Sequence, residues 1–571
     1  MTKIILSKIG CNSFSFVNFY SARAKRIIPS LTATSLIVLI LGYLFLSPKD
    51  YLRMSQDALS SITFVSNFWF ASQSGYFYTS SNENFFLHTW SLSVEWQFYI
   101  IYPVILYCLY RLYGMRTSIL SIYLMLAISF VVGFYYTFYS ATYAYYMFPL
   151  RAWEMLAGGI CFLQEKKTNN KRYSLVFEVS GALLIAFSLF YINDLTPWPG
   201  YMSIIPVLGT SLILLSNNQS SLLTSGKLQQ LIGKVSYSAY LIHWPVLVLI
   251  WKLGVTLNVI AYLLIISSAS ILLYLCFERS KRINFKNCAF YIVTVTAGFS
   301  VYASNGYEAR VPPEFRLTQR EFHWAYYGGA GYPADKVFYS QDAKDNYDFI
   351  FAGDSFAAQY AKEIDKSGIK AAELYIHGCP LLPEYSRYSE NRESSKCSAA
   401  FDDLIKLLNK NRNATLVYSL AWDNYKDIII KKGSNKRQVL TESDYEKLIA
   451  DQIQKLIAIG GNQRKYFFIG RPMDTSKSGF NCISGARLLG YKIIGSCKEE
   501  QEFKKPLIND IVKSAVMKYD NIKFIDPNDF LCKNNKCLFI VRNQPIYSDL
   551  EHLSIYGSEI VFKGVMKIID N

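Results

Sequence analysis

Long apolar runs recur in this chain up to residue 305, and none of comparable length follows. Each run is about twenty residues long, which is the length that an α-helix needs to cross a bilayer. We therefore expect a multi-pass α-helical membrane domain over residues 1–304, a connector over 305–345 and a domain in water over 346–571. The hydrophobic content of 51% and the aromatic content of 16% fit this division better than they fit a wholly soluble protein.

About nine of the apolar runs are expected to span the membrane. Lys and Arg are concentrated in alternate links between the runs, and the intervening links hold almost none. Because positively charged links stay on the cytoplasmic side, this pattern predicts a cytoplasmic N-terminus and an outer domain beyond the membrane. It also explains the net charge of +16 without nucleic acid as a partner. The predicted spans are residues 27–47, 91–112, 118–137, 148–164, 175–192, 202–216, 237–253, 257–277 and 288–304.

The cysteines of the outer domain form three pairs that are close in sequence. An even number of cysteines in a domain that faces an oxidising compartment predicts three disulfides. Zinc binding is the alternative, and it is weaker because no Cys-x-x-Cys occurs and the spacings are unequal. No metal is therefore expected. The predicted pairs are Cys379 with Cys397, Cys482 with Cys497, and Cys532 with Cys537.

Short apolar runs alternate with amphipathic ones in the outer domain. Strands are predicted at 348–352, 371–376, 415–420, 466–470 and 522–525, with helical patterns between most of them. This alternation predicts a three-layer α/β domain with a parallel sheet and helices on both faces. Because ligands of such sheets bind beyond the carboxyl ends of the strands, a site is expected in the loops after the first three strands.

The tripeptide Gly353-Asp354-Ser355 stands where the first predicted strand ends and an Ala-rich helix begins. A Ser at this point has its N–H near a helix N-terminus, where developing negative charge is stabilised. Alone the tripeptide is a weak signal, because any α/β protein can end a strand with Gly and cap the next helix with Asp or Ser.

Asp549 and His552 lie three residues apart near the C-terminus. Separately, a helix-capping Asp and a surface-loop His would explain them. With Ser355 they supply the three groups that nucleophilic acyl transfer requires, namely a hydroxyl, an imidazole and an orienting carboxylate. We therefore predict that Ser355, His552 and Asp549 form a catalytic triad.

These two motifs make the outer domain resemble the SGNH (GDSL-like) hydrolase superfamily. The resemblance implies that Ser355 is the nucleophile, that His552 is the base and that Asp549 orients the imidazole. It also implies that an oxyanion is bound by the N–H groups of Ser355 and Gly378 and by the side chain of Asn424. The block that contains Asn424 departs from the family pattern Gly-x-Asn-Asp, because residues 421–424 read Ala-Trp-Asp-Asn.

Four stretches make the membrane domain resemble acyltransferase family 3, whose multi-pass members O-acylate surface polysaccharides. The stretches are residues 19–29, 87–99, 151–158 and 236–245. Fusion of this membrane domain to an SGNH domain is a known arrangement in the family. The resemblance implies acetyl-CoA or another acyl-CoA as the donor and a cell-surface glycan as the acceptor.

A charge is costly to bury inside a membrane span, so ionisable residues within the predicted spans are candidates for function. Among them are Glu95, Arg151, Glu154 and His243. Mutual pairing for helix packing is the alternative, and for Glu154 the two explanations are equally good.

Two arginines, Arg23 and Arg26, precede the first span on the predicted cytoplasmic side. They could bind the phosphates of acyl-CoA. They would equally serve as charges that orient the chain in the membrane.

The N-terminus departs from the acyltransferase pattern. In the family, two spans precede the Phe-Tyr-x-x-Arg stretch, and the first carries a His regarded as the catalytic base of the membrane domain. This chain begins close to that stretch, so we expect these two spans and their His to be missing; residues 1–6 resemble the tail of the second span. No signal peptide is expected. His88 and His243 are the histidines of the membrane domain, and neither matches the missing position.

The sequence thus predicts an O-acyltransferase of the bacterial inner membrane, most simply an O-acetyltransferase, with its outer domain in the periplasm. The acceptor would be a surface polysaccharide, a lipopolysaccharide O-antigen or a lipid-linked precursor. An O-acyl esterase is one alternative, because the same triad can hydrolyse esters. A transport or scaffold protein with a vestigial outer domain is another.

Overall fold

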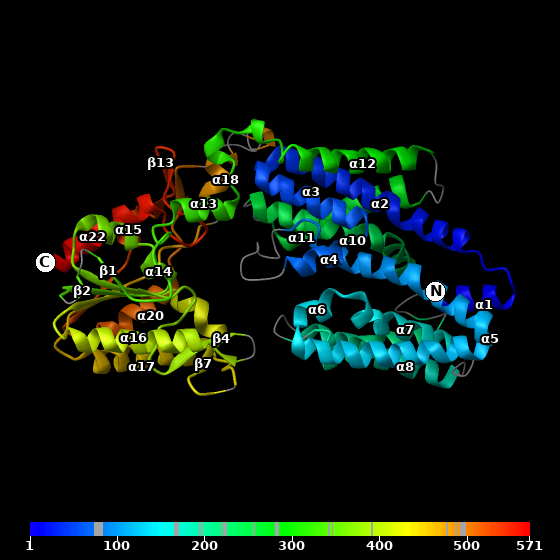
Figure 1. Cartoon of the computed structure of the whole chain (residues 1–571), viewed down its shortest axis with the longest axis horizontal. Coiled ribbons are helices and arrows are strands. Elements are labelled where there is room, and N and C mark those ends of the chain that lie inside the picture. Colours follow the sequence, from blue (N-terminus) through cyan, green and yellow to red (C-terminus); the bar gives the residue numbers. More distant parts are fainter. Residues whose placement is uncertain are drawn as a thin grey trace. The chain divides into compact units, whose positions relative to one another are not determined.

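The computed structural model divides the chain into two compact units, Met1–Glu308 and Ala309–Asn571 (Figure 1). Each unit has its own hydrophobic clusters. The structure describes the whole chain except residues 74–83, 165–170, 193–195, 197, 219–220, 222–224, 254, 256, 280–284, 341–342, 345, 390–391, 435, 476–477, 486–487, 491–497 and 571.

Helices build the first unit, and each of the nine predicted spans falls mainly on one of them. Helix α3, which is richer in polar residues, and the short helices α1, α4 and α6 were not predicted. The helices are α1 (Thr2–Gly10), α2 (Phe16–Phe45), α3 (Pro48–Ile62), α4 (Ser66–Ser72), α5 (Trp90–Tyr139), α6 (Ala141–Tyr146), α7 (Phe148–Gln164), α8 (Lys171–Tyr191), α9 (Ile204–Ser216), α10 (Lys227–Leu253), α11 (Val259–Leu273) and α12 (Phe285–Ala303).

Four stretches in the described part of this unit are long and apolar enough to cross a membrane by length and composition. They are Phe16–Phe45, Leu87–Tyr139, Ser174–Tyr191 and Val259–Glu278. The first unit is thus that of a membrane protein, whereas the full count of nine spans stays a prediction.

The long helix α5 contains two of the predicted spans. Gly114 interrupts it with a φ of 83°, a left-handed conformation that Gly adopts without strain. The hydroxyl of Ser118 then donates to the carbonyl of Leu106 at 3.2 Å. Twelve residues of a straight helix would separate these groups by about 18 Å, so the chain reverses at Gly114. The predicted link between residues 112 and 118 is therefore a tight helical turn.

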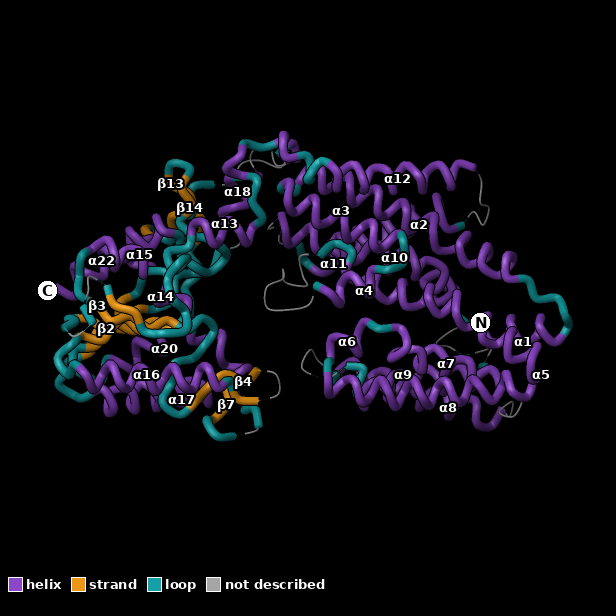
Figure 2. The backbone as a smooth tube through the Cα atoms, viewed as in Figure 1, coloured by secondary structure: helices purple, strands orange, loops and turns teal. Residues whose placement is uncertain are grey.

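A six-stranded sheet in the order β1-β3-β2-β6-β8-β10 forms the centre of the second unit (Figure 2). Five strands run parallel, and β1 runs antiparallel to β3, so the sheet is mixed rather than wholly parallel. The five longer strands match the predicted ones to within one residue at each end. The strands are β1 (Phe338–Tyr339), β2 (Phe349–Gly353), β3 (Ala371–Tyr375), β6 (Thr415–Ser419), β8 (Tyr466–Ile469) and β10 (Ile522–Ile525).

Both faces of this sheet are covered by helices (Figure 1). On β2, Ile350 and Ala352 join a cluster with α16 (Ser395–Lys410), α17 (Glu442–Gly460) and α20 (Leu507–Val516). Phe351 faces the other way, into a cluster with α15 (Ala361–Ser367) and α22 (Ile555–Asp570). Successive residues of a strand point to opposite faces, and this is why the strands read as continuous apolar runs.

Loops and short strands around the sheet carry the cysteines of the second unit. Cys379 and Cys397 form a disulfide that joins the loop after β3 to α16, and Cys532 pairs with Cys537 across the hairpin of β11 (Cys532–Lys533) and β12 (Lys536–Leu538). These are two of the three predicted disulfides. Cys497, the predicted partner of Cys482, lies outside the described residues.

Candidate active site

Ser355 lies at the sharp junction between β2 and the short helix α14 (Ser355–Ala358). Gly353 precedes this turn with a φ of 154°, and a Cβ at this position would lie 1.9 Å from the carbonyl oxygen of Ser419. Only Gly fits so close to the neighbouring strand β6. The turn therefore holds the Ser355 hydroxyl at the carboxyl edge of the sheet.

Asp354 is the residue that caps α14. Its fully buried carboxylate accepts hydrogen bonds from the N–H of Phe356 at 2.8 Å, the N–H of Ala421 at 2.9 Å and the hydroxyl of Tyr425 at 2.6 Å. Burial raises the pKa of Asp354, and these three donors oppose the rise. Asp354 thus ties the β2–α14 turn to the loop after β6, and the capping explanation applies to Asp354 rather than to Ser355.

Asp549 and His552 are fixed by a local turn between β14 (Gln544–Pro545) and α22. Asp549 Oδ1 accepts hydrogen bonds from the backbone N–H of Glu551 at 2.8 Å and of His552 at 2.6 Å. This Asx-type turn brings the side chain of the third residue back over the carboxylate. The spacing Asp-x-x-His is therefore what the turn requires.

The structure brings the three predicted triad residues together. His552 Nε2 lies 2.8 Å from Ser355 Oγ, and His552 Nδ1 lies 2.7 Å from Asp549 Oδ2. Both distances are those of direct hydrogen bonds, as a nucleophile, its base and the orienting group require. Ser355 is only partly buried, as the attack of its hydroxyl on an ester requires.

The charges of His552 and Asp549 favour the uptake of a proton by His552. Burial opposes the imidazolium form of His552, but the neighbouring Asp549 outweighs burial, and the pKa of His552 is raised. Burial likewise opposes the charge on Asp549, and His552 with its hydrogen bonds outweighs it, so the pKa of Asp549 lies below its ordinary range. Asp549 thus stays an anion that stabilises protonated His552.

Gly378 and Asn424 follow β3 and β6, the two strands that flank β2. The N–H groups of Ser355 and Gly378 donate to no backbone carbonyl in the described turns and loops, so both remain available for an oxyanion. Gly378 has a φ of 71°, and its carbonyl accepts a hydrogen bond from Arg387 at 3.1 Å. The Asn424 amide instead donates to Glu551 at 3.3 Å.

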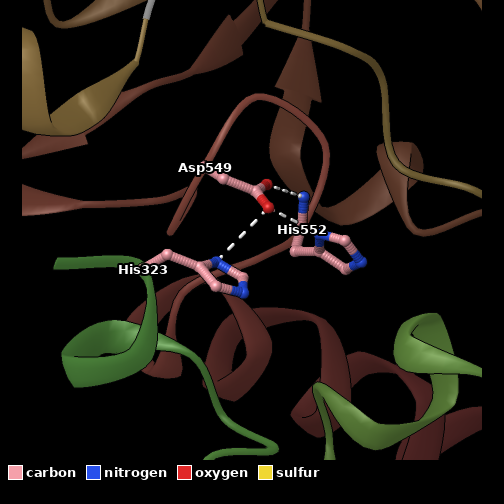
Figure 3. Close-up of side chains that lie close together, drawn as sticks. All are labelled: His323, Asp549 and His552. Carbon is pink, nitrogen blue, oxygen red and sulfur yellow. Dashed lines mark hydrogen bonds and ion pairs between the residues drawn. The ribbon is translucent and has the colours of Figure 1, made fainter. Parts of the chain in front are cut away.

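Three of the five histidines of the chain gather at this site, although sequence reasoning had named His552 alone. His323 lies on α13 (Gln319–Tyr326), and its Nδ1 is 3.3 Å from Asp549 Oδ2 (Figure 3). His377 directly precedes Gly378, and its ring lies nearly parallel to that of Trp324, with the centroids 6.2 Å apart. The position of His377 beside a predicted oxyanion donor could have drawn attention to it. Nothing in the connector sequence singles out His323.

A small cation is the other species that could occupy the space between His323, Asp549 and His552. Their ligand atoms all lie within 4.8 Å of one another. His552 Nδ1, however, is hydrogen-bonded directly to Asp549 Oδ2 at 2.7 Å, and His323 Nδ1 is hydrogen-bonded to Ser548 Oγ at 3.0 Å. A cation there would separate His552 from Asp549, so the arrangement favours proton transfer over metal binding.

A second candidate site lies in the first unit, around a cavity of about 500 Å³ that Glu95 and Glu154 both line. Glu154 forms a two-pronged ion pair with Arg151 on the same helix, at 3.0 and 2.9 Å. This is the pairing that the packing explanation expects. Glu95 accepts a hydrogen bond from Tyr99, which also lines the cavity.

The other predicted residues of the first unit are divided between this cavity and a separate cluster. The guanidinium of Arg23 lies 5.6 Å from the centre of the Tyr99 ring, close to the cavity, and Arg26 is exposed. The ring of His243 lies 5.5 Å from that of His88, and neither residue lines the cavity. The structure thus brings Arg23 toward Glu95 but leaves His243 apart from them.

Two family models together match most of the chain. Residues 6–279 match a family described as an acyltransferase domain. Residues 323–567 match a family described as an SGNH domain fused to AT3 domains. The second match begins at His323, so it includes the second half of α13.

Several curated proteins are similar to parts of the chain. An uncharacterized protein of Haemophilus influenzae is 32% identical over 234 residues, which are 39% of this chain and 95% of that protein. The O-acetyltransferase OatA of Staphylococcus aureus is 27% identical over 272 residues. The peptidoglycan O-acetyltransferase OatA of Listeria monocytogenes is 26% identical over 267 residues. Each OatA match covers 44% of this chain. The chain spans 44% of the Staphylococcus aureus protein and 43% of the Listeria monocytogenes protein, which is less than half the length of either.

Among solved structures, the periplasmic domain of a lipopolysaccharide acetyltransferase from Salmonella ser. Paratyphi A matches 40% of this chain and 86% of its own. The identity is 17% and the TM-score is 0.30, so this likeness supports no further conclusion. The family matches, in contrast, cover most of both units, and the description of the second one states the fusion of the two domains. This chain belongs to acyltransferase family 3, in the group whose membrane domain is fused to an SGNH domain.

Proposed function

We propose that the protein is a membrane O-acyltransferase that places acetyl groups on a cell-surface glycan and uses Ser355 as the nucleophile of its outer unit. The observation that carries the proposal is the hydrogen-bonded chain from Ser355 through His552 to Asp549, in a protein whose other unit is an acyltransferase domain. The names of the OatA relatives, one of which acts on peptidoglycan, support acetyl as the group transferred.

The triad would act in two steps. Ser355 Oγ attacks the carbonyl carbon of the incoming acyl group while His552 Nε2 takes the hydroxyl proton, and the N–H groups of Ser355 and Gly378 bind the oxyanion. The leaving group departs with the proton from His552, and an acyl ester remains on Ser355. A glycan hydroxyl then attacks this ester and gives its proton to His552. Finally Ser355 recovers that proton and the acetylated glycan is released.

The acyl donor would be acetyl-CoA on the cytoplasmic side of a bacterial inner membrane. The cavity beside Glu95 supports this proposal because it is large enough for an acyl-pantetheine segment, and Arg23 near its edge offers a cation for a phosphate. The alternation of charge in the links supports a periplasmic outer unit.

The acceptor would be a polysaccharide, an O-antigen or a lipid-linked glycan. Trp324 supports a sugar acceptor, because it is 42% exposed and lies nearly parallel to His377. Tyr327 connects this pair to the nucleophile, since its ring lies 6.0 Å from that of His377 and its hydroxyl donates to the carbonyl of Ser355 at 2.6 Å. Flat aromatic surfaces bind the apolar faces of ring-shaped ligands.

An O-acyl esterase is the second candidate, because the same arrangement performs hydrolysis whenever water replaces the glycan hydroxyl in the second step. The two activities have opposite effects in cells. Loss of a transferase lowers the O-acetyl content of the surface glycan, whereas loss of an esterase raises it.

The test is the O-acetyl content of glycan extracted from cells that carry the parent protein, the Ser355→Ala variant or a deletion of the whole gene. We expect the variant to lose as much acetylation as the deletion. A variant that acetylates like the parent would remove Ser355 from the mechanism. Increased acetylation would instead establish the esterase.

A further inference from the structure

His323 brings a second imidazole to the carboxylate of the triad (Figure 3). Its Nδ1 lies 3.3 Å from Asp549 Oδ2 and 3.0 Å from Ser548 Oγ. The side chain of His323 is 18% exposed, close to the 17% of His552. Asp549 Oδ2 is therefore shared by two imidazoles, one from the loop before α22 and one from α13.

The proton on His323 can be assigned from its surroundings. A bare nitrogen lone pair facing a carboxylate oxygen would be repelled, whereas an N–H there is attracted. The Ser548 hydroxyl can turn its own hydrogen to the carbonyls of His552 and Leu553, each 3.3 Å away. Nδ1–H of His323 thus donates to Ser548 Oγ at 3.0 Å, and Nδ1 lies beside Asp549 Oδ2 at 3.3 Å, where the N–H dipole stabilises the charge of the carboxylate. Burial lowers the pKa of His323 to about 4, so this donor is neutral near pH 7.

Helix α13 holds His323 firmly. A capping box closes its N-terminus: Thr318 Oγ1 accepts a hydrogen bond from the N–H of Glu321, and the Glu321 carboxylate accepts one from the N–H of Thr318. Phe322 is buried. Just beyond the helix, Tyr327 forms a backbone bridge with Ser554, in addition to its hydrogen bond to Ser355. The helix is therefore fastened both to the nucleophile turn and to the loop that carries the base.

We propose that His323 is a positioning residue of the outer active site, which holds the Asp549 carboxylate in line with His552 and takes up part of its negative charge as a neutral donor. This inference rests on the proposed function, and it makes the segment before the sheet part of the catalytic apparatus rather than a connector. A neutral donor suits this role, because a cation at the same position would repel the imidazolium that forms on His552 during the reaction.

The proposal predicts a shift in the pH dependence of Ser355 activation. His552 is faced by Asp549 and Glu551 from its own loop, by Asp354 from the β2–α14 turn, by His323 from α13 and by His377 from the loop after β3. Without the His323 donor, the negative charge of Asp549 is less stabilised by its surroundings and attracts the His552 imidazolium more strongly. The pKa of His552 then rises, and neutral His552 requires a higher pH.

The experiment measures how fast a fluorophosphonate probe labels Ser355 in membranes that contain the full chain, from pH 5 to pH 9. The probe needs an activated serine but no glycan or acetyl donor. We expect His323→Phe, which keeps the ring volume but has no donor, to move the rise of the profile upward by roughly half a pH unit. His323→Asn, whose amide nitrogen can replace Nδ1, should keep the parent midpoint.

Slower labelling without a change of midpoint in both variants would show that His323 only supports the fold, and unchanged labelling would show that it does not act on the triad. Either result overturns the proposal. Failure of the parent protein to label at Ser355, with Ser355→Ala as the blank, would instead overturn the proposed function itself. Thermal melting of each purified variant separates loss of folding from loss of positioning.

Discussion

The two units of the protein use ionisable groups in different ways. In the outer unit, Ser355, His552, Asp549 and His323 form one continuous series of contacts, and at its open end stands a partly exposed hydroxyl. In the first unit, Arg151 and Glu154 form an ion pair beside a cavity, and Tyr99 donates to Glu95 there, but no serine or cysteine beside a histidine occurs among the described residues that line it. Under the proposed function, this difference fits covalent chemistry in the outer unit and binding and delivery of the acyl group by the first unit.

Asp549→Asn is the largest single change expected at the outer site. The Asn amide would either donate to His552 Nδ1 or leave it without its acceptor, so Nε2 would tend to carry the proton and could not accept one from Ser355. Fluorophosphonate labelling of Ser355 should slow on the order of 10⁴-fold. Asp520→Asn, at an exposed position away from the site, is the matched control and should label like the parent. Comparable labelling in both variants would remove Asp549 from the triad.

A change in the first unit should lower the stability of the protein without slowing the labelling of Ser355. Arg151→Met would leave the partly buried Glu154 without its partner, at a cost of about 3–5 kcal/mol in stability. The double variant Arg151→Met/Glu154→Met should recover most of this loss, because no unpaired charge remains. Melting curves of the purified protein in detergent measure both effects. Labelling of Ser355 in the folded double variant should match that of the parent, and a matching loss of labelling would contradict the division of work between the units.

The histidines of the outer unit predict how its stability depends on pH. Burial lowers the pKa of both His323 and His377 to about 4. An unfolded His takes up a proton near pH 6.5, whereas these two do so in the folded protein only near pH 4. The unfolded state therefore binds more protons between these values, and stability falls as the pH falls from 6.5 to 4.

The expected loss is up to about 3 kcal/mol for each of these two histidines, and the raised pKa of His552 opposes part of it. His323→Asn removes one titrating group, so the melting temperature of this variant should depend less on pH than that of the parent. Equal pH dependence in the parent and in His323→Asn would show that His323 takes up its proton in the folded state as easily as in the unfolded one.

The sequence predicted those parts of the fold and the site that depend on neighbours in sequence. The five longer strands follow from apolar runs, and Ser355, Asp549 and His552 stand in two short motifs whose local turns the structure reproduces. Of the two residues that could cap the helix after β2, Asp354 is the cap, because its carboxylate accepts from the N–H of Phe356, and it also accepts from the N–H of Ala421 in the loop after β6.

What sequence reasoning missed depends on contacts between distant segments. His323 lies 226 residues before Asp549 in the chain, on an eight-residue helix that is too short for a periodic apolar pattern. Tertiary contacts hold it at the triad, among them those of Tyr327 with Ser554 and Ser355. The place of Asn424 also depends on tertiary contacts, since Arg471 and Glu551 both lie within hydrogen-bonding distance of its amide group. No local pattern contains such information.

Replacement of Trp324 gives the smallest expected effect. It best separates binding of the glycan from reaction at Ser355 in the outer unit. Trp324→Ala removes the exposed ring beside His377 but leaves His323, its neighbour on α13, in place. A stacked ring contributes roughly 1–2 kcal/mol to binding, so acetylation at limiting glycan should fall about tenfold. Labelling of Ser355 by the small probe should fall much less, because the probe makes no use of a sugar-binding surface.

Trp324→Phe is the matched control, since a smaller flat ring should keep most of the acetylation. Acetylation is measured as the O-acetyl content of extracted glycan, at equal protein levels in the membrane. An equal fall of acetylation and labelling in Trp324→Ala would mean that the ring supports α13 and the triad rather than the acceptor. The position of Trp324 next to His323 would then be the reason, because a displaced helix would carry both side chains away from the site together.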